Sequence, residues 1–190
     1  MKPHHLIFEG AELAGKSWLM SQVYDLLEQR YNQNHFILDG CHWFNCDVGV
    51  YGTKHGQLII KSYLKIFTEL KNKNLLAEKF YLSDIIYNRL HRHKEIDYQD
   101  IEKQLQQLDF KIILITLPED KKTIENRIND HIKIYPHYER ILQQPSWHIR
   151  QQEEYLKEIK KINLPYLIIK TEKLPDNNLI KQILKWIDEK

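Results

Sequence analysis

The chain has 190 residues, 42% of them hydrophobic and 28% charged, with a formal net charge of +2. This length fits one compact domain over 1–190, and the small net charge argues against a dedicated nucleic-acid-binding protein. Only two cysteines are present, and no apolar run approaches the roughly 18 residues of a membrane span, which argues against a disulfide-built secreted protein and a membrane protein. We therefore expect a soluble cytoplasmic protein without a membrane or a stable nucleic-acid partner.

Short apolar segments alternate with helical patterns along the chain. The expected strands are 6–9, 36–39, 75–78, 112–117 and 166–170. The expected helices are 16–31, 57–71, 83–91, 98–108, one after Pro118, 147–162 and 177–186. Segment 40–56 holds four of the six glycines and is expected to be a loop. Strands that alternate with helices predict a parallel sheet covered by helices on both faces, with ligands beyond the carboxyl ends of the strands.

A complete phosphate-binding motif follows the first expected strand. The motif G-x-x-x-x-G-K-[ST] is matched by Gly10, Ala11, Glu12, Leu13, Ala14, Gly15, Lys16 and Ser17. In such a loop the backbone N–H groups cradle phosphate oxygens, the lysine reaches the β- and γ-phosphates, and the hydroxyl ligates Mg²⁺. An apolar strand before the motif and a helix after it provide the context that the motif requires. The sequence therefore predicts binding of ATP with Mg²⁺.

Segment 8–17 resembles the F-E-G-x-D-G-x-G-K-S/T loop of the thymidylate kinase and deoxynucleoside kinase superfamily of P-loop kinases. Glu12 stands where Asp is usual, Leu13 where Gly is usual, and Trp18 where Thr is common. Since only glycine adopts positive φ at little cost, we expect the backbone at Leu13 to avoid it. The resemblance implies a three-layer P-loop NTPase fold, with a five-stranded parallel sheet, helices on both faces and a lid. It also places Trp18 beside the bound ATP.

Asp39 is expected to end the second strand, one strand away from the phosphate loop. There it would position or deprotonate the acceptor hydroxyl; the alternative is a turn residue before Gly40, because Asp-Gly is a common turn pair. Segment 39–43 resembles the carboxylate-then-tryptophan segment of deoxynucleoside kinases. This resemblance implies that Asp39 is the general base and that Trp43 lines the substrate pocket. The Arg-Glu-Pro segment that thymidylate kinases carry at this place is absent.

Two charged residues follow the third expected strand. Segment 78–83 resembles the D/E-R-x-x-x-S motif of the same superfamily, with Lys79 in place of the arginine. The resemblance implies that Glu78 holds Mg²⁺ through water and that Lys79 contacts a phosphate of the donor or acceptor. Lysine keeps the charge of arginine but loses its bidentate geometry. The alternative is ordinary polarity at a strand end, with Ser83 as a helix cap.

A polar segment, about 129–144, lies where members of the superfamily place a mobile lid. The arginines of such a lid close over the ATP phosphates, where they stabilise the charge that develops on the transferred group. Arg127, just before this segment, and Arg140, within it, are the candidates. Arg127 is expected to be catalytic and Arg140 to bind ATP. A solvated surface loop is the alternative for Arg140.

The resulting expectation is a kinase that transfers the γ-phosphoryl group of ATP to a nucleoside or a nucleoside monophosphate. Two alternatives stay open: a small-molecule kinase with a non-nucleoside acceptor, and a nucleotide-binding module without turnover. The resemblance also implies a homodimer as one arrangement, formed through the helices at 57–71 and after Ser83. The sequence does not specify the base, the sugar or the phosphorylation state of the acceptor.

Overall fold

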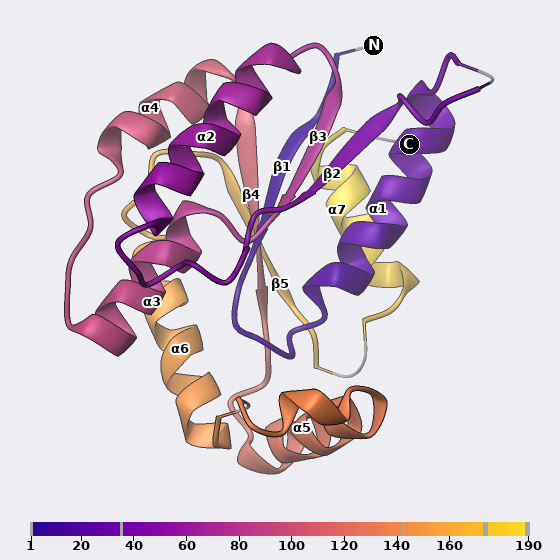
Figure 1. Cartoon of the computed structure of the whole chain (residues 1–190). Coiled ribbons are helices and arrows are strands. Elements are labelled where there is room, and N and C mark those ends of the chain that lie inside the picture. Colours follow the sequence, from indigo (N-terminus) through magenta and orange to yellow (C-terminus); the bar gives the residue numbers. More distant parts are fainter. Residues whose placement is uncertain (1, 35, 142, 173–174, 189–190) are drawn as a thin grey trace.

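The structure is a computed structural model and describes residues 2–34, 36–141, 143–172 and 175–188. Its centre is a parallel sheet in the strand order β2-β3-β1-β4-β5 (Figure 1). The strands are β1 (His5–Glu9), β2 (Cys41–Asn45), β3 (Asn74–Glu78), β4 (Phe110–Thr116) and β5 (Tyr166–Lys170). Because the chain reverses its direction across the sheet at β1, the loop after β1 lies at the switch point where such folds bind ligands.

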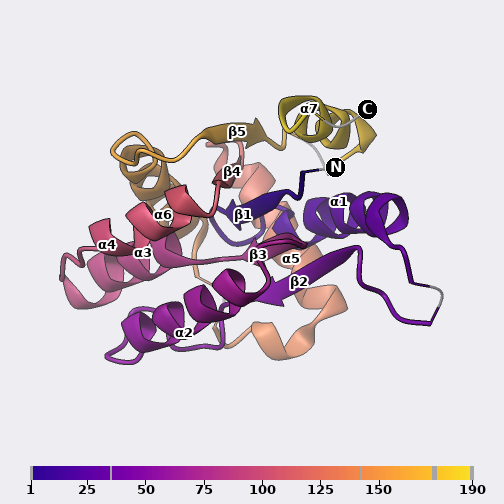
Figure 2. The same cartoon turned by 90° about the horizontal axis from the view of Figure 1, so that it is seen from above.

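Helices cover both faces of the sheet (Figure 2). One face is covered by α2 (Gly56–Glu69), α3 (Tyr81–Arg92), α4 (Gln99–Gln107) and α6 (Pro145–Glu158). The other face packs on α1 (Lys16–Tyr31), α5 (Lys121–Ile134) and α7 (Asn177–Trp186). A short 3₁₀ turn, η1 (Pro136–Tyr138), follows α5. The predicted α/β fold, with a five-stranded parallel sheet between two layers of helices, is confirmed.

Strands β1 and β3 are buried along their whole length, and β4 is buried apart from one half-buried residue. This explains their nearly continuous apolar sequences, since a central parallel strand is covered on both faces. Each face of the sheet has its own hydrophobic cluster, one around Phe67, Tyr81 and Tyr155 and the other around Leu19, Val23 and Ile183. No helix within the described residues is long and apolar enough to cross a membrane.

The predicted second strand is wrong. Segment 36–39 is a loop, with Phe36, Ile37 and Leu38 all exposed, and the strand begins only at Cys41. The pairing of β2 with β3 starts at Cys41 opposite Asn74, which fixes the register. Both segments are short and apolar, so the local pattern alone could not distinguish the loop from the strand.

Candidate functional site

The phosphate loop lies between the carboxyl end of β1 and the amino end of α1. Gly10 has φ +133° and Gly15 has φ +84°, backbone conformations that favour glycine. The Lys16 Nζ donates hydrogen bonds to the carbonyl oxygens of Gly10 at 2.9 Å and Ala11 at 2.7 Å. Burial and the nearby charge of Lys79 lower the pKa of Lys16 to about 8. The loop thus presents a buried cation, next to the positive end of a helix.

The expectation that Leu13 avoids positive φ is wrong. Its φ is +66°, in the left-handed region, which costs a residue with a side chain roughly 1–2 kcal/mol. The Leu13 carbonyl accepts a hydrogen bond from Nη1 of Arg127 at 3.1 Å, and the side chain packs against the α1 face of the core. These contacts from outside the loop offset the local strain. The loop therefore keeps a left-handed residue without a glycine at this position.

Ser17 and Glu78 meet at the carboxyl edge of the sheet. The Ser17 Oγ donates a hydrogen bond to Glu78 Oε1 at 2.5 Å, linking the first turn of α1 to the end of β3. A hydroxyl and a carboxylate are oxygen ligands of the kind that Mg²⁺ prefers. The described residues contain no cluster of three or more potential metal-binding side chains. Mg²⁺ is usually held by one or two protein groups together with phosphates and water.

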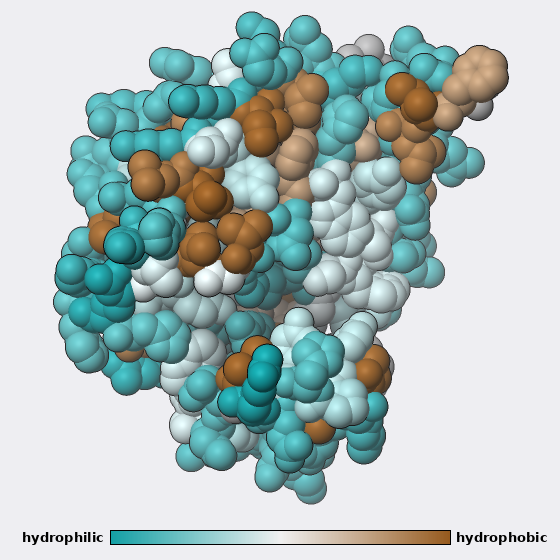
Figure 3. Space-filling view, viewed as in Figure 1, coloured by the Kyte–Doolittle hydropathy of each residue, from teal (hydrophilic) through white to brown (hydrophobic). Residues whose placement is uncertain are grey.

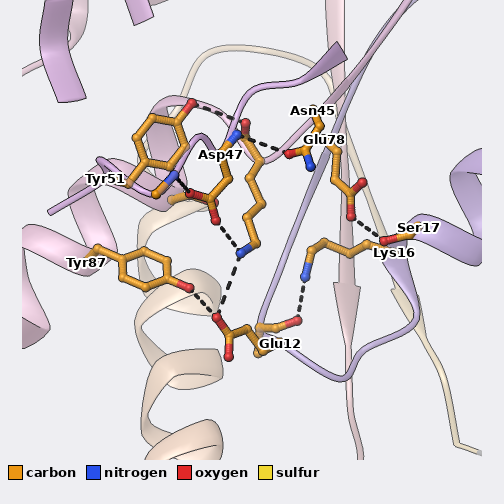
Figure 4. Close-up of polar contacts among 12 residues, drawn as sticks. Glu12, Lys16, Ser17, Asn45, Asp47, Tyr51, Glu78 and Tyr87 are labelled. Carbon is orange, nitrogen blue, oxygen red and sulfur yellow. Dashed lines mark hydrogen bonds and ion pairs between the residues drawn. The ribbon is translucent and has the colours of Figure 1, made fainter. Parts of the chain in front are cut away.

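A network of charged groups lies beside the phosphate loop (Figure 4). Lys79 Nζ lies 2.6 Å from Asp47 Oδ2 and 3.8 Å from Glu12 Oε1, and the Tyr87 hydroxyl donates to Glu12 Oε1 at 2.7 Å. Burial acts to lower the pKa of Lys79, but the acidic groups around it outweigh burial and raise the pKa above its usual range. Burial likewise acts to raise the pKa of Glu12, whereas Lys79 and the Tyr87 hydroxyl bring it below its usual value. Lys79 and Glu12 are therefore both ionised, beside the Lys16 ammonium.

Asp47 and Tyr87 were missed by the sequence analysis. Asp47 comes just after β2, at the carboxyl edge of the sheet where the analysis had placed Asp39. The misplaced second strand explains this error. Tyr87 lies one turn after Ser83 on α3, and its contact with Glu12 joins residues far apart in the sequence. The only sequence signal for Asp47 was its place in the glycine-rich segment 40–56.

Asp39 does not lie near the phosphate loop. It precedes the amino end of β2, so the length of that strand, about 16 Å, separates it from the carboxyl edge. Its Oδ2 accepts a hydrogen bond from Lys73 Nζ at 3.1 Å, and this bond lowers the pKa of Asp39. The prediction that Asp39 lies at the carboxyl edge of the sheet, beside the phosphate loop, is therefore wrong. Trp43 lies within β2, where its ring packs near Tyr24 at 6.1 Å between centroids, so it does not follow the strand as expected.

A cavity of about 350 Å³ adjoins the phosphate loop. It is lined by the loop, the start of α1, one face of α5 and the segment before α7: Leu13, Gly15, Lys16, Ser17, Trp18, Arg127, Asp130, His131, Ile134, Tyr135 and Pro175. The Arg127 guanidinium donates to the Leu13 carbonyl at 3.1 Å and to the Thr171 carbonyl at 2.7 Å. Arg127 thus joins the phosphate loop to the segment after β5, and burial lowers its pKa. Trp18 also lines this cavity.

Arg140 lies apart from these groups. It is exposed in the turn after η1 and makes no hydrogen bond or ion pair within the part of the chain that the structure describes. The predicted lid at 129–144 comprises the end of α5, η1 and the turn before α6, and Leu142 within it lies outside the described residues.

Glu9 anchors the start of the phosphate loop. Its carboxylate is fully buried and accepts hydrogen bonds from the backbone N of Phe80 at 2.8 Å and from the Ser83 hydroxyl at 2.5 Å. Burial raises the pKa of Glu9 despite these hydrogen bonds. The Ser83 hydroxyl therefore binds a carboxylate from a neighbouring strand, and the same carboxylate accepts the Ser83 backbone N–H at 3.3 Å at the start of α3. The bonds fix the end of β1 against the start of α3.

Helix α6 contacts the phosphate loop through a side-chain hydrogen bond. Gln151 Oε1 accepts a hydrogen bond from the Glu12 backbone N at 3.2 Å. Gln152 binds the backbone of Leu117 at both its N–H, at 2.5 Å, and its carbonyl, at 2.9 Å. His148 is fully buried one turn earlier, and burial lowers its pKa. The helix after the predicted lid is thus tied to both the phosphate loop and the end of β4.

No protein-family model and no curated protein sequence matches the chain. Several solved structures, however, are similar to this chain over most of its length. YorR from Bacillus subtilis, in complex with phosphorylated GDP, is 14% identical over 96% of this chain and 95% of its own, with a TM-score of 0.64. Thymidylate kinase from Ehrlichia chaffeensis is 14% identical over 99% and 100%, with a TM-score of 0.59.

Deoxyadenosine kinase from M. mycoides, bound to dCMP and a flexible dCDP, is 16% identical over 97% of this chain and 98% of its own, with a TM-score of 0.60. A gluconokinase from Sinorhizobium meliloti also matches, at 11% identity over 98% and 92%, with a TM-score of 0.53. At these identities the likeness concerns the fold. The chain has the fold of P-loop kinases.

Proposed function

We propose that this protein is an ATP-dependent phosphotransferase of the cytoplasm whose acceptor is a nucleoside or a nucleoside monophosphate. The observation that carries the proposal is the charged network of Glu12, Lys79, Asp47 and Tyr87 beside a complete phosphate loop. A protein that only binds ATP needs the phosphate loop and a cavity for the base. In this protein the ionised groups and the Tyr87 hydroxyl of the network also provide a place where a polar acceptor could bind next to the phosphate loop.

The donor side follows from the loop and the cavity. Lys16 would neutralise the β- and γ-phosphates, and the 350 Å³ cavity between Trp18 and Arg127 would take the base and sugar of ATP. Mg²⁺, when bound, neutralises charge on the β- and γ-phosphate oxygens. Ser17 and Glu78 would hold it, because their oxygens already meet at the mouth of the loop. Arg127 would keep the cavity walls together through its bonds to Leu13 and Thr171.

The acceptor side follows from the network. Asp47 would accept the proton of the attacking hydroxyl, because it follows the carboxyl end of β2 and is one strand away from Glu78. Lys79 would stabilise the charge that develops on the transferred group. Glu12 and Tyr87 would bind hydroxyl groups of the acceptor. These roles assign to Asp47 the function that the sequence analysis gave to Asp39.

The likeness to thymidylate and deoxyadenosine kinases supports a nucleoside or nucleotide acceptor. The likeness to a gluconokinase keeps a sugar-type acceptor as the second candidate. The test is ADP release from ATP and Mg²⁺ in the presence of each nucleoside, each nucleoside monophosphate and a set of free sugars and sugar acids. Turnover with a nucleoside or nucleotide supports the proposal, and turnover with a sugar alone supports the second candidate. ATP binding without turnover on any acceptor would leave a nucleotide-binding module.

Replacing Asp47 by Asn is expected to lower kcat by on the order of 10²–10⁴-fold, the usual contribution of a general base. The KM for ATP should change little, since Asp47 contacts Lys79 and not the loop backbone. Asp39→Asn is the matched control, because it makes the same chemical change at the other end of β2 and should leave kcat unchanged. Steady-state kinetics on the best acceptor decides between them. A loss of activity in the Asp39 variant alone would restore the original assignment.

Replacing Glu78 by Gln is expected to raise the Mg²⁺ concentration needed for half-maximal rate. The variant keeps the size of the side chain but removes the negative charge that would help to hold the cation near Ser17. The rate is measured against Mg²⁺ at fixed ATP for both proteins. An unchanged Mg²⁺ dependence would remove Glu78 from the metal site. The Asp47 variant should not shift this dependence.

A further inference from the structure

In the charged network beside the phosphate loop, two carboxylates share one ammonium (Figure 4). Lys79 Nζ lies 2.6 Å from Asp47 Oδ2 and 3.8 Å from Glu12 Oε1, so Asp47 alone already matches its positive charge. The Lys79 side chain is 16% exposed, Asp47 22% and Glu12 34%, so water screens these charges only in part. Lys16 also lowers the pKa of Glu12, but the phosphates of ATP would take up the charge of Lys16. The acceptor side of the loop is therefore left with an excess of negative charge.

Uncharged polar groups surround Glu12 on its other sides. The Tyr87 hydroxyl donates to Glu12 Oε1 at 2.7 Å. Gln151 Oε1 accepts from the Glu12 backbone N at 3.2 Å, and the buried Gln151 Nε2 has no hydrogen-bond partner among the described residues. His148 is fully buried, and burial lowers its pKa, so its ring is neutral at pH 7. A phenol, a carboxamide and a neutral imidazole are suited to binding hydroxyl groups and add no positive charge.

Two arginines of the neighbouring helices, the side chains best suited to binding phosphate, are committed to other groups. Arg127 of α5 lies at the donor cavity and binds the carbonyls of Leu13 and Thr171. Arg89 of α3 forms ion pairs at 2.7–3.0 Å with Glu95, Glu154 and Glu158. Figure 3 shows hydrophobic side chains gathered over α2, whereas those between α2 and the lobe of α5 and η1 are mostly hydrophilic or of intermediate hydropathy. This surface fits a polar ligand, but these arginines do not offer it a phosphate site.

The carboxylate of Asp47 distinguishes the two classes of acceptor by their chemistry. A nucleoside monophosphate attacks through a phosphate oxygen that is already ionised at neutral pH, because the second pKa of a phosphate ester is about 6. Such an oxygen has no proton to lose, so a general base does nothing for it. A hydroxyl group keeps its proton until it attacks, and a general base takes that proton. A carboxylate beside the acceptor thus helps a hydroxyl and repels a phosphate dianion.

We propose that the acceptor is an uncharged nucleoside, phosphorylated on a hydroxyl group, and that the carboxylates of Glu12 and Asp47 exclude nucleoside monophosphates. This inference rests on the proposed function and selects one of its two acceptor classes. In the transfer step, the hydroxyl oxygen forms a bond to the γ-phosphorus of ATP while its proton passes to Asp47. The bond from the γ-phosphorus to the β,γ-bridging oxygen breaks, and its electron pair leaves with ADP. The proton on Asp47 is then released to solvent.

The test compares each nucleoside with its own 5′-monophosphate in the wild-type chain, at saturating ATP and Mg²⁺, by ADP release. We expect kcat/KM for the best nucleoside to exceed that for its monophosphate by at least about tenfold, because the dianion meets uncompensated carboxylates. Salt provides a second readout on the same protein. A higher ionic strength should leave the KM of the nucleoside unchanged and lower the KM of the monophosphate, since salt screens repulsion. A cationic phosphate site would instead raise the KM of the monophosphate.

Glu12→Gln tests the exclusion directly, because it removes a negative charge and keeps an oxygen for the Tyr87 hydroxyl. We expect the ratio of kcat/KM between nucleoside and monophosphate to shift toward the monophosphate by at least about tenfold. A merely structural role of Glu12 would lower both values and leave their ratio unchanged. The matched control is Glu153→Gln, the same change at an exposed position of α6, which should leave the ratio unchanged.

The outcomes separate this inference from the proposed function. A wild-type preference for monophosphates, or a KM for the monophosphate that rises with salt, overturns the inference and leaves the proposed phosphotransferase standing. An unchanged ratio in a folded Glu12→Gln variant overturns it as well. Absence of turnover with every nucleoside and every monophosphate overturns the proposed function, and the inference with it.

Discussion

Replacing Lys16 by alanine is expected to lower phosphoryl transfer by at least about 10²–10³-fold, the usual cost of removing one group that stabilises transition-state charge. The Lys16 ammonium is buried and bound to two carbonyls of the phosphate loop, so it is already held at the place where the phosphates would lie. The measurement is kcat with saturating ATP and the best acceptor. The exposed Lys54, replaced in the same way, is the control and should keep full activity.

The pH dependence of the proposed reaction provides an independent check on Lys16. Its pKa is about 8 in the free protein, so the ammonium loses its proton as the pH rises through that value. We therefore expect kcat/KM for ATP to fall above about pH 8, because this ratio reports ionisations of the free enzyme. The residual activity of the Lys16→Ala variant should not show this fall. Full activity in a properly folded Lys16→Ala variant would contradict the assignment of the loop.

Replacing Gly10 by alanine is expected to destabilise the fold by roughly 2–6 kcal/mol, the sum of an overpacking cost and a backbone strain cost of about 1–3 kcal/mol each. A Cβ at this position would lie 2.1 Å from the carbonyl oxygen of Ile115, which belongs to the central strand β4 and cannot move away easily. The φ of +133° adds strain. Chemical denaturation measures the change in the free energy of unfolding.

Gly49→Ala is the matched control for Gly10→Ala. Gly49 also has a positive φ, +74°, but nothing lies within 4 Å of a Cβ built there. It should therefore show the strain cost without the overpacking cost. Equal destabilisation in the two variants would mean that the contact with β4 is not what excludes a side chain at Gly10.

The sequence was sufficient where a local pattern and the tertiary structure agree. The bounds of α1 and β5 matched the expected 16–31 and 166–170, because a complete phosphate motif and a short apolar run mark them. It failed at β2, where Phe36-Ile37-Leu38 and Cys41-His42-Trp43 have equally strand-like local sequences. Pairing with β3 selects the second, and Glu28 of α1 binds the Cys41 N at its start. No local rule contains either contact.

The candidate site divides in the same way. Lys16, Ser17 and Glu78 were found because they belong to motifs whose spacing has a chemical reason. Asp47, Tyr87 and Gln151 were not found, because their contacts with Lys79 and Glu12 join segments distant in the sequence. The left-handed Leu13 shows the same limit for the backbone. Its carbonyl is bound by Arg127, which is 114 residues away in the sequence.

The bonds between Gln152 and Leu117 have a consequence for hydrogen exchange. A side-chain amide here occupies the place of a neighbouring strand, accepting from the Leu117 N–H and donating to its carbonyl. Leu117 lies just beyond the end of β4, where an amide proton would ordinarily exchange quickly with solvent. Its exchange instead requires the first half of α6 to leave the sheet. The exchange rate of the Leu117 amide proton therefore reports how often α6, the helix that follows the predicted lid, detaches from the end of β4.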